Sequence, residues 1–402
     1  MIDLNMPEKV ETMQNNMKNL ARSMFRPISR KYDEAEHEYP KELDFFRNLP
    51  IMNKPKKKDP AKAAAPKKPA GEDGGAKLGA NLGLIFSTEA LCWGDAALLL
   101  SLPNAGLGNA ALLAVGTDEQ IERFGKKWIA MAITEPQSGS DSGSISTTAV
   151  LEGDEWVLNG EKIFVTCAER SDAVVVWATV DKAAGKAGVK SFLVEKGTPG
   201  FKLEKLEHKL GIRASDTGTF LLNNCRIPKN NILGSAEVKQ GTEGFKGVMK
   251  TFDNTRPLVA AMANGIASAA IDFLKEQLEK TGAKLDYKKN VHNLDSVEKA
   301  YYRMEAELEA MRLLTWRAAW MADNQLSNNL EASMSKAKAG RMATLITQEV
   351  CDICGPVGFS RKYLAEKWMR DSKIMDIFEG TGQIQHLIVA RNVLKLNSSE
   401  LR

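Results

Sequence analysis

Residues 146–166, STTAVLEGDEWVLNGEKIFVT, decide the fold class, because apolar and polar side chains alternate along them as they do along β-strands. Two turn signals divide this stretch, Glu152-Gly153-Asp154 and Asn159-Gly160, and such turns join neighbouring antiparallel strands. Short β runs with polar turns continue to about Gly234. We therefore expect a β module from Trp128 to about Gly234.

On both sides of this module the apolar residues recur three and four positions apart, which is the period of an α-helix. The helical pattern covers residues 4–48 and 82–124 before the module, and it returns from about residue 241 to the end. The order helices, strands, helices predicts an α+β chain in three parts. We expect domains at residues 1–127, 128–236 and 237–402.

Residues 54–77, KPKKKDPAKAAAPKKPAGEDGGAK, interrupt the first helical part. Their Lys, Ala, Pro and Gly content does not supply the apolar side chains of a packed core. We interpret the segment as a disordered insertion or linker. A solvated loop is the favoured role for its lysines, and contact with an anionic partner is the alternative.

The overall composition excludes several classes of protein. The 402 residues include 55 basic and 51 acidic side chains, a net charge of +4, which gives no broad basic face for nucleic acid. The N-terminus carries Asp3 and no apolar signal-peptide core, and the longest mainly apolar runs, such as residues 96–102, are too short to cross a bilayer. We expect a cytoplasmic protein with no membrane span.

The cysteines and histidines do not predict a disulfide framework or a metal site. The five cysteines are an odd set, and Cys351 and Cys354 form a C-x-x-C without the second pair or the histidines of a structural zinc site. We interpret both as small buried apolar residues, with a redox role as the alternative. The four histidines are scattered, and none has H-x-x-x-H spacing.

A lone glutamate marks the candidate site. In residues 371–394, DSKIMDIFEGTGQIQHLIVARNVL, Thr381 is a suitable N-cap for the apolar helical pattern that follows, and Glu379 lies two residues before it. One interpretation is that Glu379 only complements the helix dipole. The other is that its apolar neighbours, among them Ile377 and Phe378, raise the pKa of its carboxyl and suit it to proton abstraction.

A loop rich in glycine and serine opens the β module. It lies within residues 131–144, MAITEPQSGSDSGS, where small side chains let a ligand approach the backbone N–H groups. The loop could hold a phosphate or the edge of a polar ring, and an ordinary surface turn is an equal alternative. The chain has no G-x-G-x-x-G after a strand and no Walker lysine motif, so neither a Rossmann nor a P-loop site is predicted.

Several motifs together resemble the acyl-CoA dehydrogenases in order and spacing. They cover nearly the whole chain except residues 54–77 and 281–295, and the chain most resembles actinobacterial dehydrogenases of fatty-acid β-oxidation that work beside a second, related subunit. The resemblance implies an N-terminal helical domain, a middle β-barrel-like domain and a C-terminal four-helix bundle. The motifs are RPISRKYDEAEHEYPKEL (26–43), MAITEPQSGSD (131–141), NGEKIFVT (159–166), KLGIRASDT (209–217), FDNTRPLVAA (252–261) and KWMRDSKIMDIFEGTGQIQHLIVARNVL (367–394).

The resemblance also implies a reaction, in which Glu379 is the general base. It would remove the α-proton of an acyl-CoA thioester while the β-carbon gives a hydride to FAD, leaving a trans-2-enoyl-CoA. The developing enolate oxygen needs stabilisation, which the resemblance assigns to the Glu379 backbone N–H and a flavin hydroxyl. The electrons would pass to an electron-transfer flavoprotein.

The remaining site residues are carried over by the same resemblance. Substrate binding would involve Phe252, Asp253 and Arg256, with Ser140 and Gly380, and an arginine suits the phosphates of CoA. An ion pair between Asp253 and Arg256 within one helix is a structural alternative, and both roles are compatible. The residues implied to contact FAD are Met131, Ile133, Thr134, Ser140, Phe164, Val165, Thr166, Thr381 and Gln383.

Two departures from the family pattern concern the ADP half of the flavin. Residues 279–293, EKTGAKLDYKKNVHN, lack the usual arginine followed by Thr/Gln-Phe-Gly, and Asp352 and Pro356 replace a glutamine and a glycine in DICGPVGF, residues 352–359. We expect a dimer or tetramer, either a homo-oligomer or an α2β2 assembly with a related subunit. An oxidase that uses O2 and a non-catalytic scaffold subunit are the functional alternatives.

Overall fold

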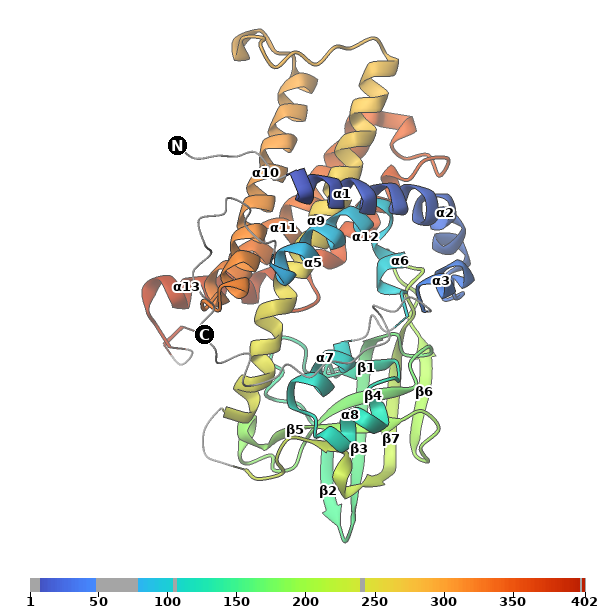
Figure 1. Cartoon of the computed structure of the whole chain (residues 1–402), viewed down its shortest axis with the longest axis vertical. Helices are drawn as coiled ribbons and strands as arrows, with labels where there is room; N and C mark the ends of the chain where they lie inside the picture. The colour runs from blue at the N-terminus through green and yellow to red at the C-terminus, as the bar shows by residue number, and fades with distance from the viewer. Residues whose placement is uncertain (1–7, 48–78, 104–106, 239–242, 398–399, 402) are drawn as a thin grey trace.

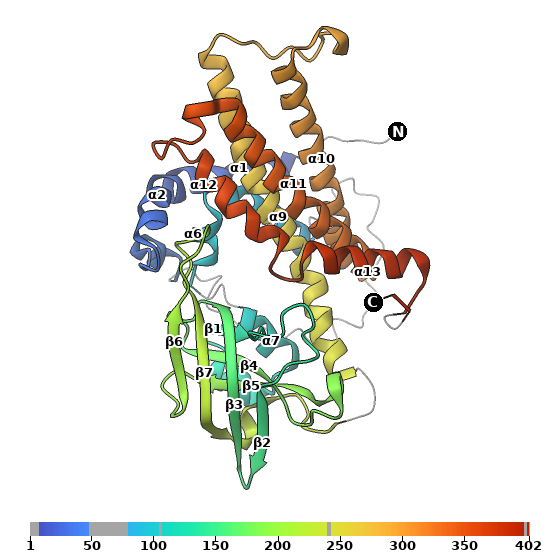
Figure 2. The same ribbon diagram turned by 180° about the vertical axis from the view of Figure 1, so that it is seen from behind.

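The computed structural model describes residues 8–47, 79–103, 107–238, 243–397 and 400–401. Figure 1 shows a helical part above and a β-sheet below, with the long helix α9 reaching from one to the other. Figure 2 shows helices α11, α12 and α13 on the opposite side of α9 from α1 and α5. The predicted insertion, residues 54–77, lies outside the described residues.

The elements follow the predicted order of helices, strands and helices, and the α+β fold is confirmed. The first helical part holds α1 (Glu8–Leu20), the π-helical turn η1 (Ala21–Phe25), α2 (Arg26–Ala35), η2 (Lys41–Leu43), α3 (Asp44–Arg47), α5 (Ala80–Gly94), α6 (Ala96–Leu100), α7 (Leu107–Val115) and α8 (Asp118–Phe124). The strands are β1 (Ile129–Ala132), β2 (Thr148–Glu152), β3 (Glu155–Thr166), β4 (Ala173–Thr179), β5 (Val189–Glu195), β6 (Phe201–Leu206), β7 (Thr217–Pro228) and β8 (Ile232–Leu233). The last part holds α9 (Glu243–Lys280), α10 (Ser296–Asp323), α11 (Asn329–Cys354), η7 (Gly355–Val357), α12 (Ala365–Ser372), η8 (Lys373–Asp376) and α13 (Gly382–Leu394).

The strands form one eight-stranded sheet in the order β6-β7-β3-β2-β4-β5-β8, with β1 parallel to β4. The predicted turn at Gly153 is confirmed, because Glu152 and Glu155 pair across it and Gly153 has a φ of 61°. The predicted turn at Asn159-Gly160 is wrong. These residues lie inside β3 at a register shift against β7, and a Cβ on Gly160 would lie 2.4 Å from the Thr147 hydroxyl. The Asn-Gly pair therefore continues β3 opposite a β-bulge of β7 and makes no hairpin.

Helix α9 forms the centre of the helical core. It packs against α5, α10 and α11, and the approach to α5 depends on Gly265, where a Cβ would lie 2.3 Å from the carbonyl oxygen of Glu89. Within the described residues, the segment Thr255–Lys280 has the length and composition of a membrane-crossing helix. Counting uninterrupted apolar runs missed this segment. Its apolar character has a structural reason, because 89% of the segment's most apolar window is buried inside the protein.

The three parts of the chain meet at a buried lysine. Lys367 of α12 lies 2.8 Å from the carboxylate of Asp95, between α5 and α6, and 2.5 Å from that of Asp371. Asp371 also accepts a 2.6 Å hydrogen bond from the backbone N–H of Ile212, in the loop that follows β6. The three charged side chains are 0–1% exposed. Two of the motifs that resemble the acyl-CoA dehydrogenases, at residues 209–217 and 367–394, thus also join the sheet to the helices.

Candidate active site

Glu379 lies in a tight turn between η8 and α13. Its own φ is 57° and that of Gly380 is 91°, so two successive residues adopt the left-handed conformation, which is costly for a glutamate. The helix begins as the sequence predicts, since the Thr381 hydroxyl accepts a hydrogen bond from the Ile384 N–H at 3.3 Å. The turn, and not the helix itself, therefore sets the direction of the Glu379 side chain.

Two long side chains hold the backbone of this turn. The ammonium group of Lys336, on α11, donates to the carbonyl oxygen of Gly380 at 2.5 Å. The amide of Gln385, on α13, donates to the carbonyl oxygens of Glu379 and Gly380, both at 3.2 Å. Lys336 and Gln385 are both completely buried. The turn is thus fixed from two helices at once.

The carboxylate of Glu379 faces α9, where the Thr255 hydroxyl donates to its Oε2 at 2.9 Å. Burial raises the pKa of the Glu379 carboxyl. The Thr255 hydrogen bond and the positive charges of Arg256 and Lys336 act in the opposite direction, without cancelling that effect. A carboxylate with a raised pKa is a stronger base than one in water, so this environment suits proton abstraction.

Of the residues predicted to bind substrate, the structure places Arg256 and Gly380 beside Glu379. Arg256 is only 6% exposed, and its guanidinium donates to the Ser333 hydroxyl of α11 at 3.3 Å. Its charge also acts on Glu379. The side chains of Phe252 and Asp253 lie outside the described part of the structure, and so does the alternative ion pair between Asp253 and Arg256.

The residues predicted to contact FAD in the β module come from two neighbouring segments. Met131 lies in β1, Ile133 and Thr134 follow it, and the backbone N–H of Ile163 in β3 donates to the Thr134 carbonyl at 2.9 Å. Phe164 lies at a bulge of β3, with a φ of 57°, and its side chain is exposed. Phe164 is 61% exposed, whereas the adjacent Val165 is buried.

An exposed aromatic residue in a strained conformation, directly before a buried valine, needs an explanation. A bulge redirects a side chain away from its regular position in the sheet. The Phe164 ring is therefore presented as a flat apolar surface, one residue after the hydrogen bond between Ile163 and Thr134, which fits contact with a planar ring system. Thr166, two residues further along at the end of β3, is half-buried.

A buried ion pair supports this part of the sheet. Lys162 of β3 lies 2.7 Å from the Glu135 carboxylate, and the two side chains are 0% and 1% exposed. Lys162 also donates to the Ile133 carbonyl at 2.9 Å, and Glu135 accepts hydrogen bonds from the backbone N–H groups of Ser146 and Thr147. Burial, the largest effect, lowers the pKa of Lys162 to about 8. For Glu135, burial is outweighed by the bonds from Lys162, Ser146 and Thr147, which lower its pKa to about 2.

We expect Glu135→Gln to lower the free energy of unfolding by about 1.5–3 kcal/mol at pH 7, the range for hydrogen bonds to charged groups. The loss stays moderate because Lys162 can release its proton. Urea unfolding measures the change, and Glu161→Gln, one residue before Lys162 on the same strand, is the matched control. Because the folded-state pKa of Glu135 is depressed, the wild-type advantage is present above about pH 4.5 and disappears as the pH falls towards 2. An unchanged unfolding curve for Glu135→Gln would contradict this role.

The glycine- and serine-rich loop is ordered by its own side chains. Ser138 donates to the Asp141 carbonyl at 2.5 Å, and the Ser144 hydroxyl donates to the Asp141 carboxylate at 2.6 Å. Ser140 lies at the exposed tip. Of the two predicted contacts after the base, Thr381 is half-buried and Gln383 is exposed. Within the described residues, the structure gives no direct contact between the Ser140 loop and the Glu379 turn.

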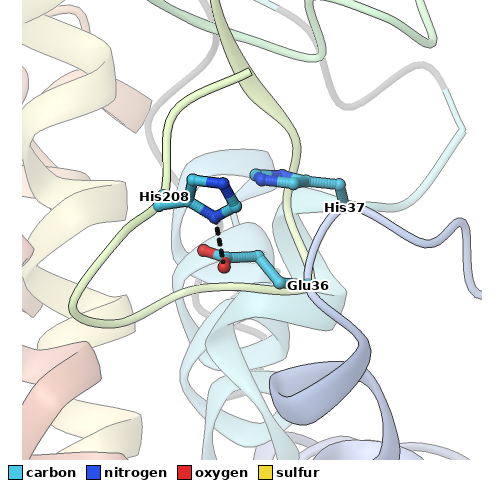
Figure 3. A group of neighbouring side chains, drawn as sticks. All are labelled: Glu36, His37 and His208. Carbon is cyan, nitrogen blue, oxygen red and sulfur yellow. Dashed lines mark hydrogen bonds and ion pairs between the residues drawn. The ribbon is translucent and has the colours of Figure 1, made fainter.

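A second polar cluster joins the first helical part to the sheet, as Figure 3 shows. Glu36, His37 and His208 offer three ligand atoms within 4.8 Å of one another. The Glu36 carboxylate, however, already accepts hydrogen bonds from the Lys209 N–H, the Arg213 guanidinium and His208, at 2.8, 3.1 and 2.9 Å. Burial and the charge of Lys209 lower the pKa of His37. Lys209 and Arg213 already place positive charge at this cluster, which disfavours a bound metal cation. We therefore interpret the cluster as a contact between domains.

A cavity of about 880 Å³ lies between α9, α10 and the loop that joins them. Its walls include Lys289, Tyr302 and Arg303, and none of the predicted site residues. The cavity therefore does not mark the chemistry around Glu379.

Sequence reasoning missed four residues that the structure brings into the site or its support: Thr255, Lys336, Gln385 and Glu135. A signal for the ion pair was present, because Lys162 shares its strand face with Trp156 and Leu158, and a lysine on an apolar face needs a buried partner. No comparable pattern marks Lys336, since its partner is a backbone carbonyl 44 residues away.

The two cysteines of the C-x-x-C pair are free thiols, of which Cys351 is buried and Cys354 is half-buried. Burial raises the pKa of Cys351 to about 12 and also raises the pKa of Cys354.

Comparisons with known proteins agree with this geometry. Residues 130–225 match the middle domain of acyl-CoA dehydrogenases, and residues 242–394 match their C-terminal domain. The mitochondrial short-chain specific acyl-CoA dehydrogenase of Bos taurus is 39% identical over 298 residues, which are 73% of this chain and 70% of that protein. The caffeyl-CoA reductase-Etf complex subunit CarC of Acetobacterium woodii is 35% identical over 75% of this chain and 79% of its own. The structure of butyryl-CoA dehydrogenase from Megasphaera elsdenii superposes with a TM-score of 0.81 at 29% identity, over 98% of this chain and 100% of that one.

Proposed function

Because this chain belongs to the acyl-CoA dehydrogenase family, we propose that it is an FAD-dependent enzyme that oxidises an acyl-CoA thioester to the trans-2-enoyl-CoA. It is an oxidoreductase that acts on acyl-CoA. In the proposed reaction Glu379 is the general base, and its carboxylate takes the α-proton of the thioester. The proton is then held on the Glu379 carboxyl.

One observation carries this proposal: the carboxylate of the half-buried Glu379 accepts a hydrogen bond from Thr255, and Lys336 and Gln385 fix the turn that presents it. The α-proton of a thioester is weakly acidic, so the base must be matched in pKa and the enolate oxygen must be stabilised. Burial raises the pKa of the Glu379 carboxyl. Among the described residues, the Glu379 backbone N–H has no hydrogen-bond acceptor, which leaves it available to the thioester oxygen.

The residues of the β module fit a flavin. Phe164 presents an exposed aromatic ring, the Ile163–Thr134 hydrogen bond joins its segment to that of Thr134, and Met131, Ile133, Val165 and Thr166 lie in the same two segments. These residues would hold the isoalloxazine ring, and Ser140 would approach it from the exposed loop tip. Bound FAD supplies the acceptor for the two electrons of the oxidation. The Glu135–Lys162 pair keeps both segments in place.

The substrate that we propose to test first is a short straight-chain acyl-CoA. The support is the similarity to a short-chain specific dehydrogenase and to butyryl-CoA dehydrogenase. Arg256 contributes a buried positive charge beside Glu379, and its proposed role stays that of binding the CoA part of the substrate. A panel of acyl-CoA substrates of increasing chain length, assayed with an artificial electron acceptor, tests the assignment. A preference for long chains would contradict it.

The activity itself has a direct test. The purified protein is expected to show the visible spectrum of an oxidised flavin, and an acyl-CoA substrate added without oxygen should bleach that spectrum. A colourless protein that cannot be reconstituted with FAD would favour the scaffold alternative. Oxygen consumption at the rate of substrate oxidation would favour the oxidase alternative.

We propose an electron-transfer flavoprotein as the electron acceptor, because a relative at 35% identity is named as part of an Etf complex. Reduction of a purified electron-transfer flavoprotein by the enzyme and substrate, compared with reduction of an artificial acceptor, measures this step directly.

The proposed assembly is a hetero-oligomer, with α2β2 as the arrangement. The loop at residues 279–293 lacks the arginine motif, and Lys289, one of its cations, is already paired with Glu298 at 2.6 Å. Pro356 lies in η7, where it removes a backbone N–H that a glycine would supply. A homo-oligomer of this chain would therefore offer the ADP half of FAD few donors, and a related subunit that keeps the arginine would supply them.

We expect the chain expressed alone to bind clearly less than one flavin per subunit, because its own ADP site lacks these donors. Co-expression with a related dehydrogenase subunit should raise the flavin content to one per copy of Glu379. Flavin absorbance after denaturation, divided by protein concentration, measures both values. Full occupancy and full activity of the chain alone would show instead that it works as a homo-oligomer.

A further inference from the structure

Lys336 has no part in the reaction described so far, although it is among the largest completely buried side chains. It projects from the middle of α11, and its Nζ reaches the Gly380 carbonyl oxygen at 2.5 Å. Taking a lysine ammonium group out of water is costly unless the surroundings compensate it. A methionine would fill the same space at lower cost, so a buried lysine at this point requires a reason.

The first part of the reason is the strained turn. Glu379 has a φ of 57°, and such a conformation persists only where the surroundings enforce it. Gln385 donates to the Glu379 and Gly380 carbonyls with longer bonds of 3.2 Å, and Lys336 supplies the short bond. The Gly380 carbonyl thus has donors from both α11 and α13. Loss of Lys336 would leave this turn with the weaker pair of bonds only.

The second part is electrostatic. Within the described residues, the charged groups that act on the Glu379 carboxylate are Arg256 from α9 and Lys336 from α11, and Asp376 of η8 acts on Lys336 in turn. Thr255 is the remaining polar contact of that carboxylate, and α13 contributes the neutral Gln385 to the turn. Positive charge stabilises the ionised, proton-accepting form of the carboxyl against the effect of burial.

We infer that Lys336 is a positioning residue for the reaction: its ammonium group fixes the Gly380 carbonyl and holds a buried positive charge that keeps Glu379 in its ionised form. This inference rests on the proposed role of Glu379 as the base. It explains why a lysine is required, because the charge and the hydrogen bond come from the same group. It also links α11 to the chemistry, although no residue of α11 was predicted to belong to the site.

The test uses three variants of the full enzyme. Lys336→Arg keeps the charge, Lys336→Gln keeps a donor without the charge, and Lys336→Met removes both. Lys338→Met, two residues further along α11 at the partly exposed Glu307 ion pair, is the matched control. The acidic limb of kcat/KM against pH should move up by about one pH unit in Lys336→Gln and Lys336→Met, the lower end of the effect of a nearby opposite charge. It should stay in place in Lys336→Arg and in the control.

A second measurement needs no turnover. Difference infrared spectroscopy identifies the carboxyl band of Glu379 as the one that is lost in Glu379→Gln, and the titration of that band gives its protonation directly. We expect the same upward shift in the two neutral variants. Because this titration does not depend on activity, it separates a failure of the inference about Lys336 from a failure of the proposed function.

Two results would overturn the inference. The first is an unchanged titration of Glu379 in both neutral variants. The second is that neither neutral variant folds while Lys336→Arg does, because Lys336 would then serve folding alone. If only Lys336→Met fails to fold, Lys336→Gln decides the question.

Discussion

Glu379→Gln should lose nearly all turnover while it keeps bound flavin and substrate affinity. The amide fills the space of the carboxylate and can still accept the hydrogen bond from Thr255, but it cannot accept the α-proton. Removal of a general base lowers the rate by roughly 100- to 10,000-fold. Steady-state assays with an artificial acceptor give kcat, and the visible spectrum and substrate titration give flavin content and affinity.

A control variant separates loss of the base from a general loss of a carboxylate. Glu349→Gln, on the outer part of α11 where Glu349 pairs with Arg303, should retain wild-type kcat. If Glu379→Gln keeps more than about a tenth of wild-type activity, which is outside the range for a lost general base, Glu379 is not the base.

Lys367→Met should lower the free energy of unfolding by about 3–5 kcal/mol, the usual cost of removing one partner from a buried ion pair. The substitution would leave Asp95 and Asp371 close together in the interior without a cation. It would also loosen the loop at Ile212, because that loop is held by Asp371. The midpoint of urea unfolding, followed by tryptophan fluorescence and by flavin release, measures the loss.

Two further variants check the cause. Lys202→Met removes an exposed ion pair with Glu204 and should change stability by less than about 1 kcal/mol. Lys367→Met combined with Asp371→Asn should recover part of the loss, because fewer charges remain buried. A loss below about 1 kcal/mol in Lys367→Met would show that the pair contributes no more than a surface contact.

The pH dependence of this junction follows from the direction of the shift at Lys367. Burial lowers the pKa of Lys367, but the charges and hydrogen bonds of Asp371 and Asp95 outweigh it and raise the pKa above its ordinary 10.5. A raised folded-state pKa means that the stabilisation is fully present below about pH 10.5 and is lost only as the pH rises through the higher value in the folded protein. Near neutral pH the stabilisation by Lys367 is therefore fully present, and its titration should not make stability change with pH there.

Much of the architecture could be predicted from the chain, because hydrophobic period is a local property. The alternation at residues 146–166 predicted strands, the three- and four-residue spacing elsewhere predicted helices, and Thr381 caps α13 as expected. The motif around Glu379 predicted the candidate base, and the family comparison agrees with the fold that it implied. The roles of the individual site residues remain predictions.

Local patterns failed where the partner of a residue is distant in the chain. Asn159-Gly160 has the composition of a hairpin turn, but Thr147 of the neighbouring segment leaves space only for a glycine, and the strand continues opposite a bulge of β7. The apolar segment Thr255–Lys280 was not recognised as the core helix, because its character comes from packing against α5, α10 and α11.

The sequence alone thus determined the spacing of apolar residues that distinguishes strands from helices, the helix cap at Thr381, and the position of Glu379 before that cap. These features depend only on neighbours within a few positions. Only the tertiary structure decided what surrounds that glutamate: Thr255 is 124 residues away along the chain from Glu379, and Lys336 is 44 residues away from Gly380. Burial raises the pKa of the Glu379 carboxyl, and the positive charges of Arg256 and Lys336 act in the opposite direction. These quantities exist only after α9, α11 and the turn before α13 have packed together, which is why no reading of residues 371–394 alone could supply them.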